Sequence, residues 1–302
     1  MIAPALLPGA TLGVVGGGQL GRMFAMAAAR IGYRVHVLAP EEDAPAAQVA
    51  AVHTRAAYDD GGAVARFAAS VGAVTYEFEN IPPATLRAIA SRTPVHPGPS
   101  LLEITRHRIQ EKTFLRDHGI PVTPFLPVSN PSDLPTAARA LGGTAVLKTS
   151  EWGYDGKGQA VFCHRDDPAA AWAALGGPAE CILERRIALA GEFSVIVARD
   201  AAGRTVFYGP FQNEHQNHIL DVTTWEAEPR GPAARQAREI GQAVADAFGL
   251  VGLICVECFV ATDGEVMVNE IAPRPHNSGH LTIEACSISQ FEQQARVTAG
   301  LG

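Results

Sequence analysis

The sequence predicts two architectures in one chain, an α/β unit followed by an α+β unit. Strand-like and helix-like segments alternate over residues 1–100, which is typical of a parallel sheet covered by helices. From residue 145 onward strand-like segments come in pairs, which is typical of antiparallel sheet. The length of 302 residues is about twice the ~150 residues of a common domain. We therefore expect two or three domains, with boundaries at 1–100, 101–188 and 189–302.

Composition and charge exclude several classes of protein. Hydrophobic residues make up 47% of the chain and charged residues 18%, so the chain can build sizeable cores. The formal net charge of −7 lacks the basic character of a nucleic-acid-binding protein. No apolar run reaches the ~18 residues of a membrane span, and the N-terminus lacks the basic segment of a secretion signal. We predict a soluble cytoplasmic protein with no nucleic-acid or membrane partner.

The five cysteines are too few for a disulfide framework in a chain of this length. Cys255 and Cys258 form a Cys-x-x-Cys pair inside the strand-like segment 251–260. Residues three apart on a strand point to opposite faces, and no second pair completes a zinc site. We interpret both residues as thiols of the core.

The α/β prediction for residues 1–100 depends on the order of their segments. Strands are expected at 11–18, 33–40 and 73–80, and helices at 19–31, in the Ala-rich stretch after residue 40, at 61–71 and at 83–93. Pro82 and Pro83 stand at the start of the last helix, where proline is favoured. This order predicts a parallel sheet with helices on both faces.

The remaining chain predicts antiparallel sheet and a few helices. A charged amphipathic helix is expected over 103–119, ending at Gly119, and a proline-rich linker over 121–135. Strands are expected in pairs at 145–150 with 159–163, at 180–187 with 192–200, and at 251–260 with 265–273, with a further strand at 204–212 and a helix at 233–249.

The glycine motif Gly16-x-Gly18-x-x-Gly21 lies between the first strand and the first helix. Such glycines let a phosphate approach a helix N-terminus, where free N–H groups favour anions. A dinucleotide site also needs an acidic residue at the end of the second strand, and Glu41 comes slightly late. Three interpretations stay open: a dinucleotide, another phosphorylated ligand, or a turn that only packs the helix on the strand.

A second glycine loop, Glu151 to Gln159, lies between two strand-like segments. It is not a P-loop, because no Gly-Lys-Ser/Thr sequence opens a helix after it. Its three glycines are typical of a mobile lid whose N–H groups can wrap phosphate oxygens, and Lys148 before it can neutralise phosphate charge. The loop predicts phosphate binding; the alternative is an ordinary hairpin loop.

Two glutamates are predicted to face each other near the C-terminus. With Asp263 and Gly264 as a two-residue turn, Thr262 pairs with Glu265, and Glu257 then falls opposite Glu270. Two like charges at that spacing repel unless a cation lies between them, and Mg²⁺ prefers one or two carboxylates together with substrate phosphates. A pair sharing one proton and a solvated face are the alternatives, and the apolar neighbours argue against the solvated face.

Five motifs, taken together, resemble the ATP-grasp superfamily and, within it, the family of 5-(carboxyamino)imidazole ribonucleotide synthases of purine biosynthesis. They are GGGQLGRM (16–23), YEFENI (76–81), GYDGKGQ (153–159), ECFV (257–260) and NEIAPRPHNSGH (269–280). The resemblance covers essentially the whole chain. It implies an ATP-grasp fold preceded by a Rossmann-like N-terminal domain, with 101–188 as the small and 189–302 as the large ATP-grasp domain.

The resemblance also implies an activity and its cofactors. Members of this family are ligases that use ATP and Mg²⁺ to join bicarbonate to aminoimidazole ribonucleotide through carboxyphosphate, and a homodimer is expected. Metal binding is implied for Glu257 and Glu270. Catalytic roles are implied for Arg274, His276, Asp155 and Lys157. The expected nucleotide-binding residues are Arg108, Lys148, Gly153, Tyr154, Asp155, Gly156, Lys157, Gly158, Gln159, Glu184, Arg185, Arg186, Ile187, Glu192, His215, Asn269 and Glu270.

Within that set the resemblance implies separate tasks. Arg108, Lys148 and the glycine loop hold phosphates, and residues 184–187 contact adenine through backbone groups. Glu192 binds the ribose, and His215 lies near the triphosphate. The expected ribonucleotide-binding residues, which reassign the first glycine motif to the substrate, are Gly18, Gln19, Leu20, Glu77, Arg274, His276, Asn277 and Ser278.

The chain departs from the family in two places. Family members continue for several tens of residues beyond Gly302, and that tail supplies basic groups near the substrate, so this chain is expected to lack it. Many ATP-grasp enzymes also have Asn two positions after the second metal glutamate, where this chain has Ala272. Phosphate oxygens and water are then expected to complete the metal coordination.

Three other functions compete with this interpretation. The nearest is a related ATP-grasp carboxylase or a formate-using ligase. An NAD-dependent oxidoreductase built on Gly16 to Gly21 leaves the second glycine loop and the paired glutamates unexplained. A catalytically inactive nucleotide-binding module is the third alternative.

Overall fold

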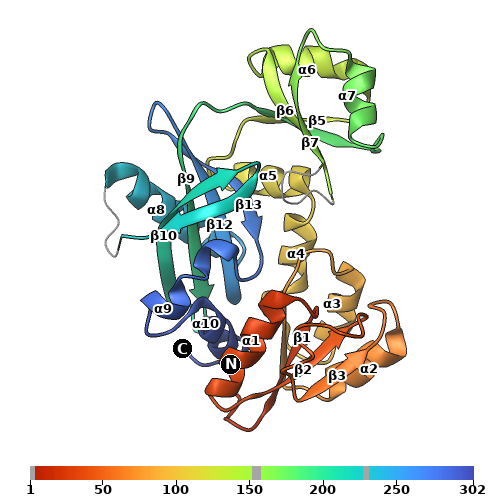
Figure 1. Cartoon of the computed structure of the whole chain (residues 1–302), viewed down its shortest axis with the longest axis vertical. Coiled ribbons are helices and arrows are strands. Elements are labelled where there is room, and N and C mark those ends of the chain that lie inside the picture. Colours follow the sequence, from red (N-terminus) through yellow and green to blue (C-terminus); the bar gives the residue numbers. More distant parts are fainter. Residues whose placement is uncertain (1–3, 152–157, 227–230) are drawn as a thin grey trace.

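The computed structural model describes residues 4–151, 158–226 and 231–302. Over these residues the strands form three sheets, each drawn from a separate stretch of the chain. Figure 1 shows the N-terminal sheet at one end of the molecule, the small sheet at the other end, and the large sheet between them. The predicted boundaries at residues 100 and 188 stay predictions.

The N-terminal sheet is parallel, as the alternating segments predict. Its order is β3-β2-β1-β4, from β1 (Thr11–Val15), β2 (Arg34–Ala39), β3 (Val52–Arg55) and β4 (Ala73–Tyr76). The helices are α1 (Gln19–Arg30), α2 (Gly61–Ala69) and α3 (Pro83–Ala90). Adjacent residues of β1 belong to different cores, Val14 with Phe24 of α1 and Val15 with Phe67 of α2. Helices therefore cover both faces of this sheet, and the α/β prediction is confirmed.

The Ala-rich stretch after residue 40 is not a helix, so that prediction is wrong. It forms turns, followed by the additional strand β3. Ala46 donates its backbone N–H to the carbonyl of Gly17 at 2.9 Å. A side chain at Gly17 would meet the methyl group of Ala44 at 2.6 Å. The alanines are therefore selected for close packing against the turn before α1, and helix propensity is overridden by this contact.

The single helix predicted over 103–119 is two helices, so that prediction is corrected. They are α4 (Pro99–Thr105) and α5 (Arg108–Asp117). His107 between them has extended backbone, with φ −118° and ψ 103°, which interrupts the helical path. Leu115 of α5 packs into the core of the large sheet. The interruption thus lets α5 turn toward the centre of the molecule.

The small sheet has the order β5-β8-β6-β7 and is antiparallel. Its strands are β5 (Phe125–Val128), β6 (Thr144–Thr149), β7 (Gln159–Cys163) and β8 (Cys181–Arg185). A short 3-10 helix, Pro131–Asp133, and the helices α6 (Leu134–Ala140) and α7 (Pro168–Ala174) accompany it. Trp172 of α7 packs with Phe162 of β7 in its core. The predicted pairing of the strands on either side of the second glycine loop is confirmed.

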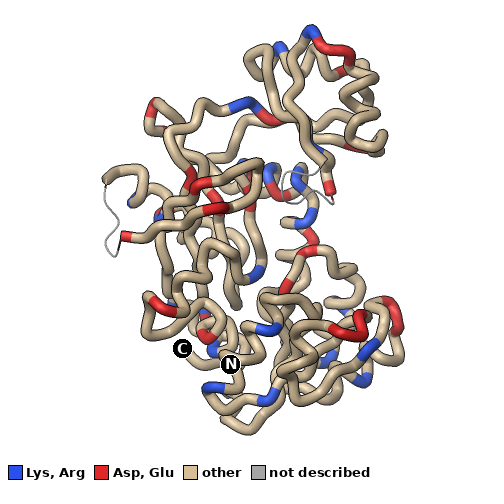
Figure 2. Tube along the Cα trace, in the orientation of Figure 1, with Lys and Arg blue, Asp and Glu red and all other residues tan. Residues whose placement is uncertain are grey.

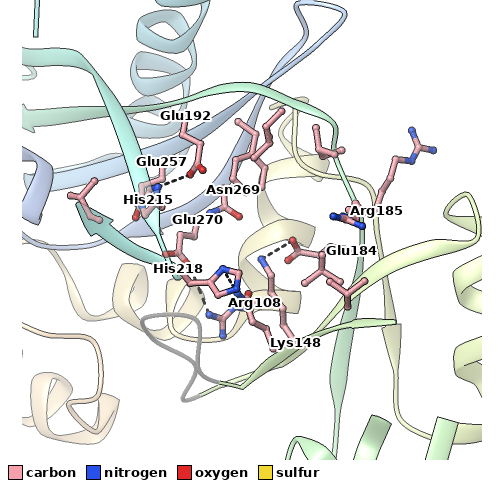
Figure 3. A pocket seen from close by; sticks show the side chains of 18 of the residues that line it. Arg108, Lys148, Glu184, Arg185, Glu192, His215, His218, Glu257, Asn269 and Glu270 are labelled. Atoms are coloured by element: carbon pink, nitrogen blue, oxygen red, sulfur yellow. Dashed lines mark hydrogen bonds and ion pairs between the residues drawn. The ribbon is translucent and has the colours of Figure 1, made fainter. Parts of the chain in front are cut away.

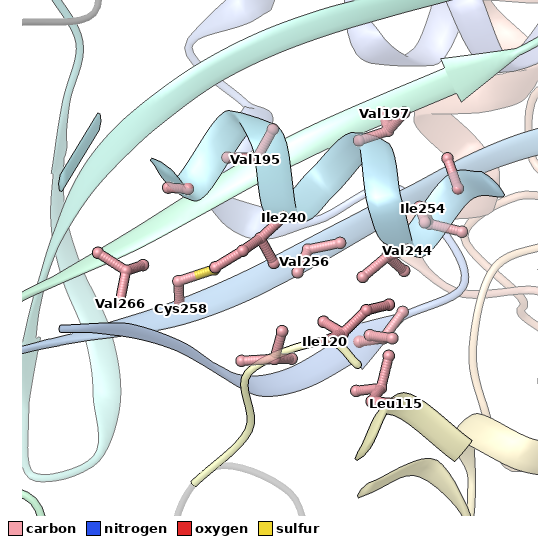
Figure 4. Close-up of a cluster of buried hydrophobic side chains, with 14 of the residues drawn as sticks. Leu115, Ile120, Val195, Val197, Ile240, Val244, Ile254, Val256, Cys258 and Val266 are labelled. Atoms are coloured by element: carbon pink, nitrogen blue, oxygen red, sulfur yellow. The ribbon is translucent and has the colours of Figure 1, made fainter. Parts of the chain in front are cut away.

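The large sheet is also antiparallel, with the order β11-β10-β9-β12-β13. Its strands are β9 (Leu189–Arg199), β10 (Thr205–Gln216), β11 (Ile219–Thr224), β12 (Gly252–Ala261) and β13 (Val266–Ala272). Helix α8 (Gly231–Ala247) packs Ile240 and Val244 against Val195 and Ile254 (Figure 4). The predicted pairing of 180–187 with 192–200 is wrong, because β8 and β9 lie in different sheets.

The opposite face of the large sheet meets the C-terminal helices. After a 3-10 turn (Asn277–Gly279) come α9 (Thr282–Ala285) and α10 (Gln290–Thr298). The side-chain amide of Gln294 on α10 donates to the Thr75 hydroxyl of β4 at 3.0 Å, so α10 joins the large sheet to the N-terminal sheet. Cys258 packs in the core under α8 and Cys255 in the core under α10, which confirms the two core thiols on opposite faces.

Among the described helices, none combines the length and the apolar character needed to cross a membrane. Figure 2 shows basic and acidic residues gathered between the small and the large sheet, at the level of α5. This concentration of charge marks the region where the site is built.

Candidate active site

A cavity of about 800 Å³ lies between the small and the large sheet, a volume typical of small-molecule sites (Figure 3). Its polar lining comes from α5, from the small sheet and the segment after it, and from the large sheet and the segment after it. These residues are Arg108, Lys148, Gln159, Glu184, Arg185, Arg186, Glu192, His215, His218, Glu257, Asn269, Glu270, His276 and Asn277. Its apolar lining includes Val146, Val161, Ile187, Leu189, Ile219, Leu220 and Phe259.

The small-sheet wall is built around an ion pair. Lys148 of β6 donates to Glu184 of β8 at 2.9 Å, and Lys112 of α5 lies 3.6 Å from the other oxygen of Glu184. Burial opposes ionisation of Glu184, but the two lysines outweigh it and hold the pKa of that carboxyl below its usual value. Lys148 and Arg108 both line the cavity here, so this side presents cations suited to phosphate oxygens.

On the opposite wall Glu192 of β9 and His215 of β10 are joined at 3.1 Å. The hydrogen bond to the Glu192 carboxylate raises the pKa of His215. Figure 3 shows this pair across the cavity from Lys148 and Glu184. The cavity therefore has a cationic wall on the small sheet and a paired acid and base on the large sheet.

Glu257 and Glu270 are direct partners in the ladder of β12 and β13, as the hairpin predicts. The predicted two-residue turn is wrong. Ala261 donates its N–H to the carbonyl of Glu265 at 2.9 Å, which leaves a three-residue turn ending at Gly264, where φ is +90°. This turn shifts the register by one residue, and a β-bulge between Glu257 and Cys258 shifts it back. The two deviations cancel, so the predicted pairing holds.

The bulge also decides which side chains face the cavity. Cys258 pairs with Val268 and Glu257 with Glu270, so Asn269 is the extra residue on β13. Consecutive side chains of a regular strand point to opposite faces, yet Asn269 and Glu270 both line the cavity. The Oδ1 atom of Asn269 is buried and, among the described residues, has no hydrogen-bond partner. It is an acceptor for which the described residues supply no donor.

The two facing glutamates have different electrostatic surroundings. Burial opposes the charge on Glu257, but the His276 ring, 3.1 Å away, lowers the pKa of Glu257 below its usual value. Burial and the facing charge of Glu257 raise the pKa of Glu270, although Arg108 lies 3.8 Å from it. Within the described residues no group of three or more metal-binding side chains is present. Two carboxylates and a partnerless amide oxygen fit a divalent cation that takes its other ligands from phosphate or water.

The first glycine motif lies outside this cavity. Glu77, just after β4, accepts hydrogen bonds from the backbone N–H groups of Gly18 at 2.6 Å and Gly21 at 3.2 Å. Burial raises the pKa of Glu77, against the opposing effect of these two N–H groups. The anion position at the start of α1 is therefore filled by a carboxylate of the chain. This contact argues against a dinucleotide pyrophosphate at that position.

The segment after β13 connects the two regions. Arg274 lies 2.5 Å from Glu79 of the N-terminal unit, and its Nε atom is buried with no partner among the described residues. His276 and Asn277 line the cavity, whereas Ser278 is fully buried and accepts from the Ser194 hydroxyl at 2.7 Å. Ser278 also lies 2.8 Å from the His276 ring, so it supports that ring from behind.

The predicted site residues thus fall into three groups. Arg108, Lys148, Gln159, Glu184 to Ile187, Glu192, His215, Glu257, Asn269, Glu270, His276 and Asn277 surround the cavity. In the described structure Gly18, Gln19, Leu20, Glu77, Gly158, Arg274 and Ser278 do not line it. Gly153, Tyr154, Asp155, Gly156 and Lys157 lie outside the described residues.

Sequence reasoning missed Glu111, Lys112 and His218. Glu111 and Lys112 sit within a charged amphipathic segment, and charged residues on such a helix are normally exposed. His218 forms the tip of the β10–β11 hairpin with φ +65° and lies 3.4 Å from Gln159. The Asn217-His218 dipeptide is the signal in the sequence that could have located this turn, because Asn and His adopt positive φ more often than most other residues.

Comparisons with known proteins define the class first. The family model of the ATP-grasp domain matches residues 113–291, and that of the ribonucleotide synthetase preATP-grasp domain matches residues 9–106. The chain is therefore an ATP-grasp protein, and the predicted fold is confirmed.

Relatives identify the particular family. An N5-carboxyaminoimidazole ribonucleotide synthase of Brucella melitensis is 44% identical over 299 residues, covering 98% of this chain and 82% of that protein. A Bacillus subtilis protein of the same name is 40% identical, covering 98% of this chain and 78% of that protein. This chain belongs to the N5-carboxyaminoimidazole ribonucleotide synthase family, as the five motifs predict.

Solved structures agree with this assignment. An ADP complex of an N5-carboxyaminoimidazole ribonucleotide synthetase has a TM-score of 0.94 at 40% identity, covering 100% of this chain and 80% of that one. An Aspergillus clavatus synthase in complex with ADP and 5-aminoimidazole ribonucleotide has a TM-score of 0.88 at 28% identity, covering 97% of this chain and 77% of that one.

Proposed function

We propose that this chain carries out the reaction of its family, the ATP-dependent carboxylation of 5-aminoimidazole ribonucleotide to N5-carboxyaminoimidazole ribonucleotide in purine biosynthesis. The observation that carries the proposal is the pairing of Glu257 with Glu270 at a cavity that is also lined by Lys148 and Arg108. Opposed carboxylates and a cationic wall suit a metal–triphosphate group, which needs both.

The nucleotide half of the site follows from the cavity lining. Lys148 and Arg108, with the glycine loop Gly153 to Gln159, would hold the phosphates. Backbone groups of 184–187 would contact adenine, with apolar Val146 and Ile187 beside them. Glu192 would accept from the ribose hydroxyls, and His215, held by Glu192, would point its second ring nitrogen toward the phosphates.

Mg²⁺ is part of the proposal. Glu257, Glu270 and the Oδ1 of Asn269, which has no partner among the described residues, would hold it. When bound, the ion neutralises charge on the phosphate oxygens and polarises the γ-phosphorus for attack. Without it, the chain reduces the repulsion of Glu257 and Glu270 through His276 and Arg108.

The ribonucleotide half would lie between the N-terminal unit and the segment after β13. Glu77 and the turn at Gly18, Gln19 and Leu20 would form one side, and Arg274, His276 and Asn277 the other. Catalytic roles are proposed for Arg274 and His276, and for Asp155 and Lys157 of the glycine loop. Ser278 would act on the substrate through His276.

The chemistry proceeds by two displacements. A bicarbonate oxygen attacks the γ-phosphorus, the bond to the β–γ bridging oxygen breaks, and ADP leaves carboxyphosphate. The exocyclic amine of the ribonucleotide then forms a bond to the carboxyl carbon, either of carboxyphosphate itself or of CO₂ released from it. Phosphate is the leaving group in both routes, and the amine loses a proton. Positioning and charge stabilisation by Lys148 and Arg108 lower the barrier of the first step. A homodimer in the cytoplasm completes the proposal.

Product analysis with each substrate omitted in turn tests the function. The full mixture of ATP, Mg²⁺, bicarbonate and aminoimidazole ribonucleotide should release ADP and yield the carboxylated ribonucleotide. ADP release should cease when the ribonucleotide is omitted. Equal product formation with formate in place of bicarbonate would assign the chain to a formate-using ligase instead. Equal ADP release without the ribonucleotide would refute the assignment.

A further inference from the structure

Helix α5 carries two buried ionisable side chains that the proposed reaction does not use. The side chains of Glu111 and Lys112 are each 1% exposed, although adjacent helix positions normally place at least one charged group in water. Burying a charge is costly unless it is paired and hydrogen-bonded. Their partners therefore show what the two residues do.

Both side chains bind the backbone of β13 on either side of Glu270. The ammonium of Lys112 donates to the carbonyl of Asn269 at 2.9 Å. A carboxylate oxygen of Glu111 accepts from the N–H of Ile271 at 3.1 Å. The residue between these two anchored peptide groups is the proposed metal ligand.

These contacts are needed because of the bulge at Asn269. β13 is an edge strand of the large sheet, and its outer edge at Val268 is covered by backbone bonds to Pro121 and Thr123. Beyond Val268 the extra residue changes which backbone groups point outward. There the side chains of α5 form the hydrogen bonds that backbone groups form at Val268, since buried peptide N–H and C=O groups need hydrogen-bond partners. The bulge is thereby fixed from outside the sheet.

Lys112 also ties the bulge to the opposite wall of the cavity. Its ammonium lies 3.6 Å from Glu184, which in turn bonds Lys148 at 2.9 Å. One buried side chain thus spans from the metal strand β13 to the nucleotide strand β8.

We propose that Glu111 and Lys112 are positioning residues for the divalent cation: they hold the β13 bulge so that Asn269 and Glu270 face the cavity together. This inference rests on the proposed function of that site. Loss of the Glu111 contact frees the Ile271 peptide, lets the bulge relax, and turns one of the two ligands away. Nucleotide contacts on β6 and β8 do not pass through Glu111 and are unaffected.

The test measures ADP binding by calorimetry with Mg²⁺ and with EDTA. The ratio of the two affinities reports the cation site, and the EDTA value alone reports the nucleotide pocket. Glu111→Leu removes the acceptor for Ile271 and should lower the ratio about tenfold, in the range found for residues that support metal ligands. Its ADP affinity in EDTA should stay within about twofold of wild type.

Matched variants separate positioning from general destabilisation. Glu111→Gln keeps an acceptor oxygen and should retain the ratio within about threefold. Leu115→Ala removes a buried side chain of the same helix and should lower the melting temperature without changing the ratio. Lys112→Met and Lys112→Gln both remove the charge beside Glu184, but only Gln can donate to Asn269, so Met should show the lower ratio. If Glu111→Leu does not fold, the comparison of Lys112→Met with Lys112→Gln tests the inference instead.

Three results would overturn the inference, and those that refute the positioning role alone are distinguishable from the one that refutes the cation site. An unchanged Mg²⁺ ratio in Glu111→Leu, or an equal loss in Leu115→Ala, refutes the positioning role and leaves the proposed function standing. A wild-type protein that binds ADP equally with Mg²⁺ and EDTA refutes the cation site itself, and the positioning role falls with it.

Discussion

The carboxylate of Glu77 lies 2.6 Å from the backbone nitrogen of Gly18 and caps the N-terminus of α1 from the neighbouring strand end. A glycine motif that elsewhere admits a phosphate is here closed by an anion of the chain itself. The same carboxylate lies so close that a methyl group on Gly18 would meet its oxygen at 2.7 Å. The glycines of this motif therefore serve the approach of Glu77, a proposed substrate ligand.

Gly18→Ala should displace Glu77 and weaken substrate binding. The steric conflict should cost about 1–3 kcal/mol of stability, as overpacking does elsewhere, and raise the KM for the ribonucleotide more than the KM for ATP. Gly61→Ala is the control, because its Cβ would meet nothing within 4 Å. Melting curves measure the loss of stability, and the KM values for the ribonucleotide and for ATP measure the effect on each substrate. A KM change equal for both substrates would show that Glu77 is not a ligand of the ribonucleotide.

Glu270→Gln should nearly abolish ATP turnover while the fold stays intact. The amide keeps the size of the side chain but removes a charge that a divalent cation needs. Loss of repulsion with Glu257 should leave the melting temperature unchanged or raise it. Glu265→Gln, an exposed position on the same hairpin, should behave as wild type. Wild-type turnover of Glu270→Gln at saturating Mg²⁺ would remove Glu270 from the metal site.

The hairpin that carries Glu270 shows how far sequence patterns reach. The Asp-Gly turn and the apolar alternation predict that two strands pair and that Glu257 faces Glu270, and both hold. The three-residue turn and the bulge at Asn269 are not predictable from that pattern. The bulge is accompanied by tertiary contacts, namely the bonds of β13 to the 121–123 segment and to α5, and the turn by the bond from the N–H of Thr262 to the carbonyl of Ala188.

The burial of Glu111 and Lys112 is the other feature that the sequence pattern does not reveal. Glu111 and Lys112 lie within the segment RIQEKTFLRD, which has the composition of an exposed helix. Their burial follows from the break at His107, which directs α5 between the sheets, and from the backbone groups that the bulge exposes there. Residues whose partners are peptide groups of a distant strand leave no trace in local periodicity. The glutamates and glycines of the site are easier to find, because their residue types and spacing alone indicate metal and phosphate binding.

His36 should contribute a loss of stability between neutral and mildly acidic pH. Burial, with a smaller effect of His53, lowers the pKa of His36 below its ordinary value of 6.5. The unfolded chain therefore binds this proton more readily, and the stability present above pH 6.5 is lost as pH falls toward the folded-state pKa. His36→Gln should flatten the dependence of the free energy of unfolding on pH between 7 and 5.

A control distinguishes titration of His36 from loss of its contacts. The ring bonds the hydroxyls of Ser70 and Thr54, each at 2.8 Å. Thr54→Val removes one of these bonds but keeps the imidazole, so it should lower stability at every pH and preserve the slope. His96 and His280, whose pKa values are also lowered by burial, contribute to the slope that remains in His36→Gln, and His215 and His276, whose pKa values are raised, oppose it. Parallel curves for wild type and His36→Gln would contradict the assignment.

Arg274→Ala should silence the reaction without weakening nucleotide binding. Its guanidinium lies 2.5 Å from Glu79 of the N-terminal unit, where the ribonucleotide is proposed to bind. Loss of positioning there should reduce ribonucleotide-dependent ADP release about a hundredfold, with ADP affinity nearly unchanged. Glu79→Gln breaks the same ion pair but keeps the cation, so it should retain most of the activity. Equal losses in both variants would mean that Arg274 serves only to join the two units.

Oxygen transfer from bicarbonate to phosphate should reveal the order of bond formation. If bicarbonate attacks the γ-phosphorus, the new P–O bond carries a bicarbonate oxygen, and cleavage of carboxyphosphate at its C–O bond leaves that oxygen in phosphate. With ¹⁸O-bicarbonate, each phosphate should therefore contain one labelled oxygen, whether the amine attacks carboxyphosphate or released CO₂. The reaction must be quenched within seconds, and the label remaining in bicarbonate measured, because bicarbonate exchanges with water. Phosphate that takes its fourth oxygen from ¹⁸O-water instead would show that ATP is hydrolysed directly and that carboxyphosphate does not form.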